Sequence, residues 1–177
     1  ELYSIRKELH RLEQQNQQYV VALKRLNEEL NENIEMVAVD QASVRTRRLA
    51  ERLAIVDTPV LLSGEAGVGK EKTARFIHDH SRRESAPFMR IDFSVIPGND
   101  AARYLFGYQD TEKDEYHMGI LESADGGTVY LDEIAEMPAA VKGPFLALVR
   151  EGACVLGDGV LRKLDIRFMA GSKYSLE

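Results

Sequence analysis

The eight residues from Gly64 to Glu71, which read G-E-A-G-V-G-K-E, decide the fold. They fit the pattern G-x-x-x-x-G-K, in which glycines let the backbone close around a phosphate and the lysine contacts the β- and γ-phosphates. The apolar run 59–63 precedes them and a helical segment to about His80 follows, which is the usual context of such a loop. A glycine turn that binds nothing is the alternative. The residues predicted to bind a nucleotide are Gly64, Glu65, Ala66, Gly67, Val68, Gly69, Lys70 and Glu71.

A pair of carboxylates forms the second motif. Sixty-two residues after Lys70, the apolar run 128–132 ends in Asp132 and Glu133. In nucleotide hydrolysis the first acid holds the Mg²⁺ shell and the second polarises the attacking water, so we predict Asp132 as metal ligand and Glu133 as catalytic. A helix cap and a surface acid are the alternative reading. The hydroxyl that usually binds Mg²⁺ is absent, because Glu71 follows the lysine in place of Ser or Thr.

Strand-like and helix-like segments alternate around these motifs. The runs 87–92 and 164–170 predict two more strands, and helical patterns cover 41–55 and 139–150. Strands that alternate with helices favour an α/β fold with a mostly parallel sheet and helices on both faces.

The charge, the cysteine count and the lengths of the apolar runs exclude several classes of protein. The 177 residues carry 23 Lys and Arg against 29 Asp and Glu, a net charge of −6, which argues against a primary DNA-binding surface in this stretch. Cys154 is the only cysteine, so a disulfide framework within the chain is excluded and a cytoplasmic setting is expected. No apolar run approaches the ~20 residues of a membrane span, and we expect no membrane association. The sequence starts at Glu1 without Met, which indicates a piece of a longer protein.

Residues 1–33 contain neither Pro nor Gly and repeat apolar residues at heptad spacing. Asn16 falls at a core position, where a polar residue fixes the register and favours parallel dimers. We predict a two-stranded coiled coil over residues 1–33, followed by an α/β domain over 34–177. The alternative is one amphipathic helix lying on its own domain. The predicted core positions are Leu2, Ile5, Leu9, Leu12, Asn16, Tyr19, Leu23, Leu26, Leu30 and Asn33.

Several stretches resemble motifs of one protein family. The loop 64–71 resembles G-E-S-G-T-G-K-E, 105–107 resembles E-L-F-G, and 121–134 resembles F-E-x-A-x-G-G-T-L-F-L-D-E-I. Residues 151–152 and 165–167 match the stretch before a sensor strand. These are motifs of the bacterial enhancer-binding proteins, the NtrC-like activators of sigma-54 RNA polymerase, and the resemblance covers roughly residues 34–177.

This resemblance implies a P-loop AAA+ domain that stops before its helical lid and follows a signalling linker at residues 1–33. It implies ATP or ADP with Mg²⁺ as ligands, and it places Asp92 at the switch position that contacts the catalytic Glu133. The implied partners are further copies of the chain, as a dimer or a higher ring, and RNA polymerase holoenzyme. DNA binding would belong to a C-terminal domain outside this sequence.

Two departures from the family concern the contact loop and the switch. Residues 108–118 replace the G-A-F-T-G-A loop that touches the sigma factor, and they read as an acidic, solvated surface strip. Asp92 stands where the family has Asn. A carboxylate cannot donate a hydrogen bond to Glu133 unless one of the two is protonated.

Two further departures concern the γ-phosphate. Lys173 aligns with the family's sensor Asn, and Leu156 aligns with an Arg that faces the neighbouring subunit's nucleotide; Arg162 or Arg167 could substitute for it. We therefore predict the nucleotide-binding core of an NtrC-type transcription regulator that binds ATP-Mg, hydrolyses it weakly or not at all, and does not act through sigma-54. The alternatives are an active sigma-54 activator with a diverged contact loop, and a structural dimerisation module with a vestigial nucleotide site.

Overall fold

The computed structural model describes residues 41–173 of the chain. The predicted coiled coil, with Asn16, lies outside the described residues. Within residues 41–173, no helix is long and apolar enough to cross a membrane.

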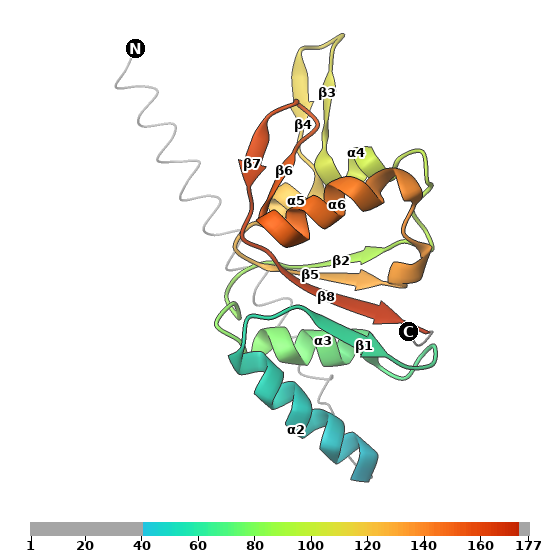
Figure 1. The fold of residues 1–177 in the computed structure, drawn as a ribbon, viewed down its shortest axis with the longest axis vertical. Coiled ribbons are helices and arrows are strands. Elements are labelled where there is room, and N and C mark those ends of the chain that lie inside the picture. The colour runs from blue at the N-terminus through green and yellow to red at the C-terminus, as the bar shows by residue number, and fades with distance from the viewer. Residues whose placement is uncertain (1–40, 174–177) are drawn as a thin grey trace, which may run out of the picture. The chain divides into compact units, whose positions relative to one another are not determined.

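Four parallel strands form the central sheet, in the order β1-β8-β5-β2 (Figure 1). Their bounds are Val60–Ser63 for β1, Arg167–Ser172 for β8, Thr128–Asp132 for β5 and Phe88–Asp92 for β2. Three strands lie where the sequence predicts them. The fourth, predicted at 164–170, starts three residues later, because the Leu164 amide donates to the carbonyl of Gly152 at 2.9 Å and so lies outside the sheet.

Helices cover both faces of this sheet, as the alternating pattern predicts (Figure 1). One face carries α2 (Gln41–Ile55) and α3 (Lys70–Asp79). The other face carries α4 (Ala101–Phe106), α5 (Ile120–Ser123) and α6 (Ala139–Glu151). Because helices shield both faces, the central strand β5 is apolar and buried along almost its whole length.

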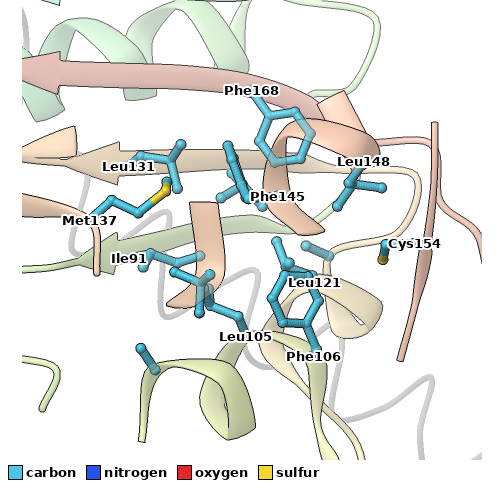
Figure 2. Packing of buried hydrophobic residues seen from close by; sticks show 14 of the residues in the cluster. Ile91, Leu105, Phe106, Leu121, Leu131, Met137, Phe145, Leu148, Cys154 and Phe168 are labelled. Carbon is cyan, nitrogen blue, oxygen red and sulfur yellow. The ribbon is translucent and has the colours of Figure 1, made fainter. Parts of the chain in front are cut away.

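The larger hydrophobic core fills the space between the sheet and α4, α5 and α6 (Figure 2). Phe145 of α6 packs edge-on against Phe168 of β8, with ring centroids 5.1 Å apart. Leu131 and Ile91 contribute from the sheet, and both are buried. Cys154 joins this core as a free, buried thiol, as its apolar surroundings predict.

Two hairpins extend beyond the core on the side of α4 to α6 (Figure 1). In the first, β3 (Tyr108–Asp110) pairs with β4 (Glu115–His117); in the second, β6 (Ala153–Val155) pairs with β7 (Leu161–Lys163). The acidic strip expected at 108–118 thus contains two strands that the sequence pattern does not predict. The rings of Tyr108 and His117 stack 4.5 Å apart across the first hairpin and hold it closed, while its tip is exposed as expected.

His78 links α3 to the sheet from a buried position. It is 2% exposed, and its Nδ1 lies 2.9 Å from Oγ1 of Thr128 on β5. Burial lowers the pKa of His78 from 6.5 to about 4, so the folded chain keeps this ring neutral.

This neutral histidine predicts an acid-sensitive fold. Between pH ~6.5 and ~4 the unfolded chain binds a proton at His78 that the folded chain excludes, so the free energy of unfolding falls as pH falls. His78→Gln removes the titration and keeps a hydrogen-bonding side chain. We expect the unfolding free energy of the variant to fall by about 2 kcal/mol less than that of the wild type between pH 7 and about 4.5. Urea titrations measure this difference.

His80→Gln is the matched control, because His80 is exposed at the end of the same helix. An equal loss of stability in wild type and His78→Gln would contradict the assignment.

Candidate functional site

The four parallel strands end at the same edge of the sheet, which places the predicted motifs together (Figure 1). Asp92 at the end of β2 pairs in register with Asp132 at the end of β5. The loop after β1 joins the same edge through the amide of Gly64, which donates to the carbonyl of Ser172 at 3.1 Å. Ligands of open α/β sheets bind at this carboxyl edge.

The loop 64–69 has the backbone of a phosphate cradle. Gly67 and Gly69 adopt φ values of 80° and 94°, which side chains with a Cβ rarely tolerate. Gly69 then precedes the first residue of α3, so the positive end of that helix faces the loop. The predicted nucleotide loop therefore has the backbone that binding requires.

Lys70 spans the loop from the first turn of α3. Its Nζ donates to the carbonyls of Gly64 at 2.9 Å and Glu65 at 3.1 Å. The same atom lies 3.7 Å from Oε1 of Glu133, and the side chain is only 8% exposed. The ammonium is thus fixed between the loop and the second acid of the β5 motif.

Glu133 lies directly after β5 in a left-handed backbone conformation, with φ 48° and ψ 57°. Such a conformation costs a non-glycine residue about 1–3 kcal/mol and is concentrated at functional sites. Besides the contact with Lys70, Oε2 of Glu133 accepts a hydrogen bond from the backbone amide of Lys173 at 3.3 Å. The carboxylate therefore faces the nucleotide loop, where a water-polarising group is required.

Asp132 carries hydrogen bonds on both carboxylate oxygens. Oδ2 accepts from Nη2 of Arg90 at 2.6 Å, and Oδ1 accepts from the hydroxyl of Tyr130 at 3.3 Å. Burial is the main cause that raises the pKa of Tyr130, so this hydroxyl remains a donor.

Asp92 is ionised, and both of its carboxylate oxygens accept hydrogen bonds. Oδ1 accepts from the hydroxyl of Ser94 at 2.6 Å, which is the main cause that lowers the pKa of Asp92. Oδ2 accepts from Nη2 of Arg90 at 2.9 Å. An ionised Asp92 offers no proton to Glu133, so it cannot hold that residue as an Asn would.

A cavity of about 340 Å³ opens between these groups. Its lining includes Gly67, Lys70, Asp92, Asp132 and Glu133. No group of three or more acidic, His or Cys side chains among the described residues converges on a metal position. One carboxylate beside a phosphate loop nevertheless suits Mg²⁺, which takes one or two carboxylates and completes its shell with water and phosphate oxygens. Asp132 fits that requirement.

The structure decides between the two candidates for an arginine that reaches a neighbour. Arg167 is 2% exposed and donates to the carbonyl of Leu53 at 2.7 Å, so it binds the end of α2. This burial disfavours a role for Arg167 at a neighbour's nucleotide. Arg162 is 33% exposed and is paired with Asp158 and Glu122. Leu156, at the family's arginine position, is buried.

Lys173 and Arg90 add positive charge to the site edge. Nζ of Lys173 contacts Oε1 of Glu136 at 3.0 Å, beside the backbone bond to Glu133. Arg90 was missed by sequence analysis, and its only signal was its place two residues before Asp92 on a predicted strand. Side chains two apart on a strand share one face, so this spacing could have found it.

Comparison with known proteins agrees with this geometry. Residues 36–177 match the family described as "Sigma-54 interaction domain". The transcriptional regulatory protein FlgR of Helicobacter pylori is 41% identical over 145 residues, which cover 80% of this chain and 38% of FlgR. NtrC of Escherichia coli is 36% identical over 134 residues, covering 73% of this chain and 29% of NtrC. The chain thus spans well under half the length of these relatives.

Solved structures extend the similarity to the fold. NtrX from Brucella abortus in complex with ADP superimposes with a TM-score of 0.77 at 30% identity, covering 88% of this chain and 36% of NtrX. The P-loop NTPase domain of an E. coli sigma-54 activator gives a TM-score of 0.53 at 18% identity over 79% of this chain and 80% of its own, which shows the fold alone. With its family match over most of its length, its parallel sheet and its phosphate loop, the chain belongs to the sigma-54 interaction domain family of AAA+ P-loop proteins.

Proposed function

We propose that this chain is the nucleotide-binding core of an NtrC-type transcription regulator that binds Mg²⁺-ATP and hydrolyses it slowly. The observation that carries the proposal is the position of Lys70, held between the loop carbonyls and Glu133. The similarity to NtrX, whose structures include complexes with ADP and with ATP, supports nucleotide binding at the same loop.

We infer slow hydrolysis because the family's trans arginine has no counterpart at its position in this chain. A trans arginine accelerates related phosphoryl chemistry by ~10³–10⁵. At the family's position this chain has the buried Leu156, and Arg162 is neutralised by Asp158 and Glu122. Glu133 would orient water, but the transition-state charge would be stabilised mainly by Lys70 and by Mg²⁺ held at Asp132.

The first hairpin supports the proposal that the domain does not act through sigma-54. Its exposed tip, 111–115, carries Glu112, Lys113, Asp114 and Glu115. Charged, solvated side chains are poorly suited to insertion into an apolar partner surface. The domain would act on RNA polymerase holoenzyme by changing how its own protomers associate, with nucleotide binding shifting that equilibrium.

An active sigma-54 activator is the second candidate, and one observation favours it. The site keeps the arrangement that hydrolysis needs at Lys70, Asp132 and Glu133. It also keeps the left-handed backbone conformation of Glu133, which costs free energy. The third reading, a vestigial site, is disfavoured by the same cost.

Residues 1–33 complete the proposal as a signalling linker that pairs as a parallel coiled coil in the cytoplasm. A dimer brought together in this way raises the local concentration of the nucleotide domains. DNA recognition is assigned to a part of the protein outside this sequence.

Lys70→Ala tests the nucleotide site. The variant loses a charge-assisted phosphate contact worth about 1.5–3 kcal/mol, so affinity for ATP and ADP should fall roughly tenfold to hundredfold. Isothermal titration calorimetry measures it, with Lys142→Ala on the exposed face of α6 as control. Equal affinities in wild type and Lys70→Ala would remove the basis of the proposal.

Reconstitution of the full-length regulator with both polymerase holoenzymes tests the output. We expect no open complex with the sigma-54 form, because the contact loop is replaced by the acidic hairpin. Brisk ATP turnover together with sigma-54 open complexes would favour the second candidate instead.

Equilibrium sedimentation tests the linker. We expect a dimer at micromolar concentration, and Asn16→Leu should raise its stability while loosening the choice of oligomer. A chain that stays monomeric well above this concentration would contradict the coiled coil.

A further inference from the structure

Arg90 lies near the end of β2, and its guanidinium contacts three carboxylates of the candidate site. Nη2 donates to Oδ2 of Asp132 at 2.6 Å and to Oδ2 of Asp92 at 2.9 Å. Nε lies 3.2 Å from Oε2 of Glu71, the acid that replaces the usual hydroxyl residue. Neither the loop motif nor the β5 motif contains this arginine.

The contact with Asp132 involves the same carboxylate that suits Mg²⁺. Its Oδ1 accepts from Tyr130 at 3.3 Å and its Oδ2 from Arg90 at 2.6 Å, so a metal ion at Asp132 would meet the arginine on the same carboxylate. A guanidinium and a divalent cation at one carboxylate repel each other. The contact of Arg90 with Oδ2 therefore opposes binding of Mg²⁺ at Asp132.

The positive charge of Arg90 offsets part of the negative charge of the site. Four acids, Glu71, Asp92, Asp132 and Glu133, line the cavity with two lysines, Lys70 and Lys72, so the lining is net negative without Arg90. A triphosphate without its metal would be repelled by these acids. The 42% exposed Arg90 side chain is free to move toward solvent once a metal ion supplies the charge.

We propose that Arg90 is a positioning residue that holds Asp132 in place of a divalent cation and competes with Mg²⁺ for it. The inference rests on the proposed function and deepens it. Arg90 supports binding of metal-free nucleotide and opposes binding of the metal, so its removal should move the two affinities in opposite directions. A purely structural arginine would weaken both alike.

Arg90→Gln tests this inference through binding of methylanthraniloyl-ATP, followed by fluorescence in EDTA and in saturating Mg²⁺ at one ionic strength. We expect the variant to bind the nucleotide more weakly in EDTA and equally or more tightly in Mg²⁺. The dissociation constant in EDTA divided by that in Mg²⁺ should therefore rise about tenfold, which is the combined effect of several partly exposed ion pairs. Arg90→Lys, which keeps the charge and loses the forked contact, should give an intermediate ratio.

Arg82→Gln is the matched control, because it removes the same charge from an exposed arginine other than the one that pairs with Glu71, Asp92 and Asp132. A ratio unchanged from wild type, or equal weakening in both conditions, would overturn the inference and leave the proposed function standing. If Arg90→Gln fails to fold by circular dichroism, the ratio for Arg90→Lys decides in the same way. Wild-type protein that binds no nucleotide in either condition would overturn the proposed function, and the inference with it.

Discussion

The parallel pairing of β5 with β2 and β8 is the constraint on which the rest of the structure depends. Because the three strands run in one direction, Asp92, Asp132 and the chain after Ser172 reach the same edge. The loop after β1 is tied to that edge by the hydrogen bond from Gly64 to Ser172. A one-residue slip of β5 would turn Asp132 to the opposite face and separate it from Arg90.

Burial on both faces is what fixes this pairing. Val129 and Leu131 of β5 point into the core beneath α6, while Tyr130 points toward α3. The site is therefore built at the end of a buried strand, which suits a group that must be held accurately, such as Glu133. Lys70 and Arg90 offset part of its negative charge, and the buried Leu156 stands where the family resemblance places an arginine.

Much of this could be predicted from the sequence, because apolar runs and glycine patterns act locally. The nucleotide loop, three of the four central strands and the acids after β5 follow from such patterns. The hairpin at 108–117 could not be found in this way, since its stability comes from the stacking of Tyr108 on His117 across the turn. The sequence could not separate Arg167 from Arg162, because the burial of Arg167 against α2 depends on tertiary packing that no local pattern marks.

The ion pairs of Arg90 likewise could not be predicted from local sequence patterns. Sequence patterns placed Asp92 and Asp132 at the ends of two predicted strands, but that these strands are neighbours and that Arg90 lies between the acids are seen only in the structure. The consequence is chemical as well as structural. Asp92 is held ionised by Ser94, so the contact between this position and Glu133 that the family resemblance implied is lost.

We propose that this site binds a nucleotide and keeps it largely intact. A single-turnover experiment tests it most directly, with the protein in excess over radiolabelled Mg²⁺-ATP and the conversion to ADP followed over time. The account predicts that most of the ATP is bound while hydrolysis takes minutes or longer, since a trans arginine worth ~10³–10⁵ in rate is missing. Complete conversion of the bound ATP within about a second would contradict it.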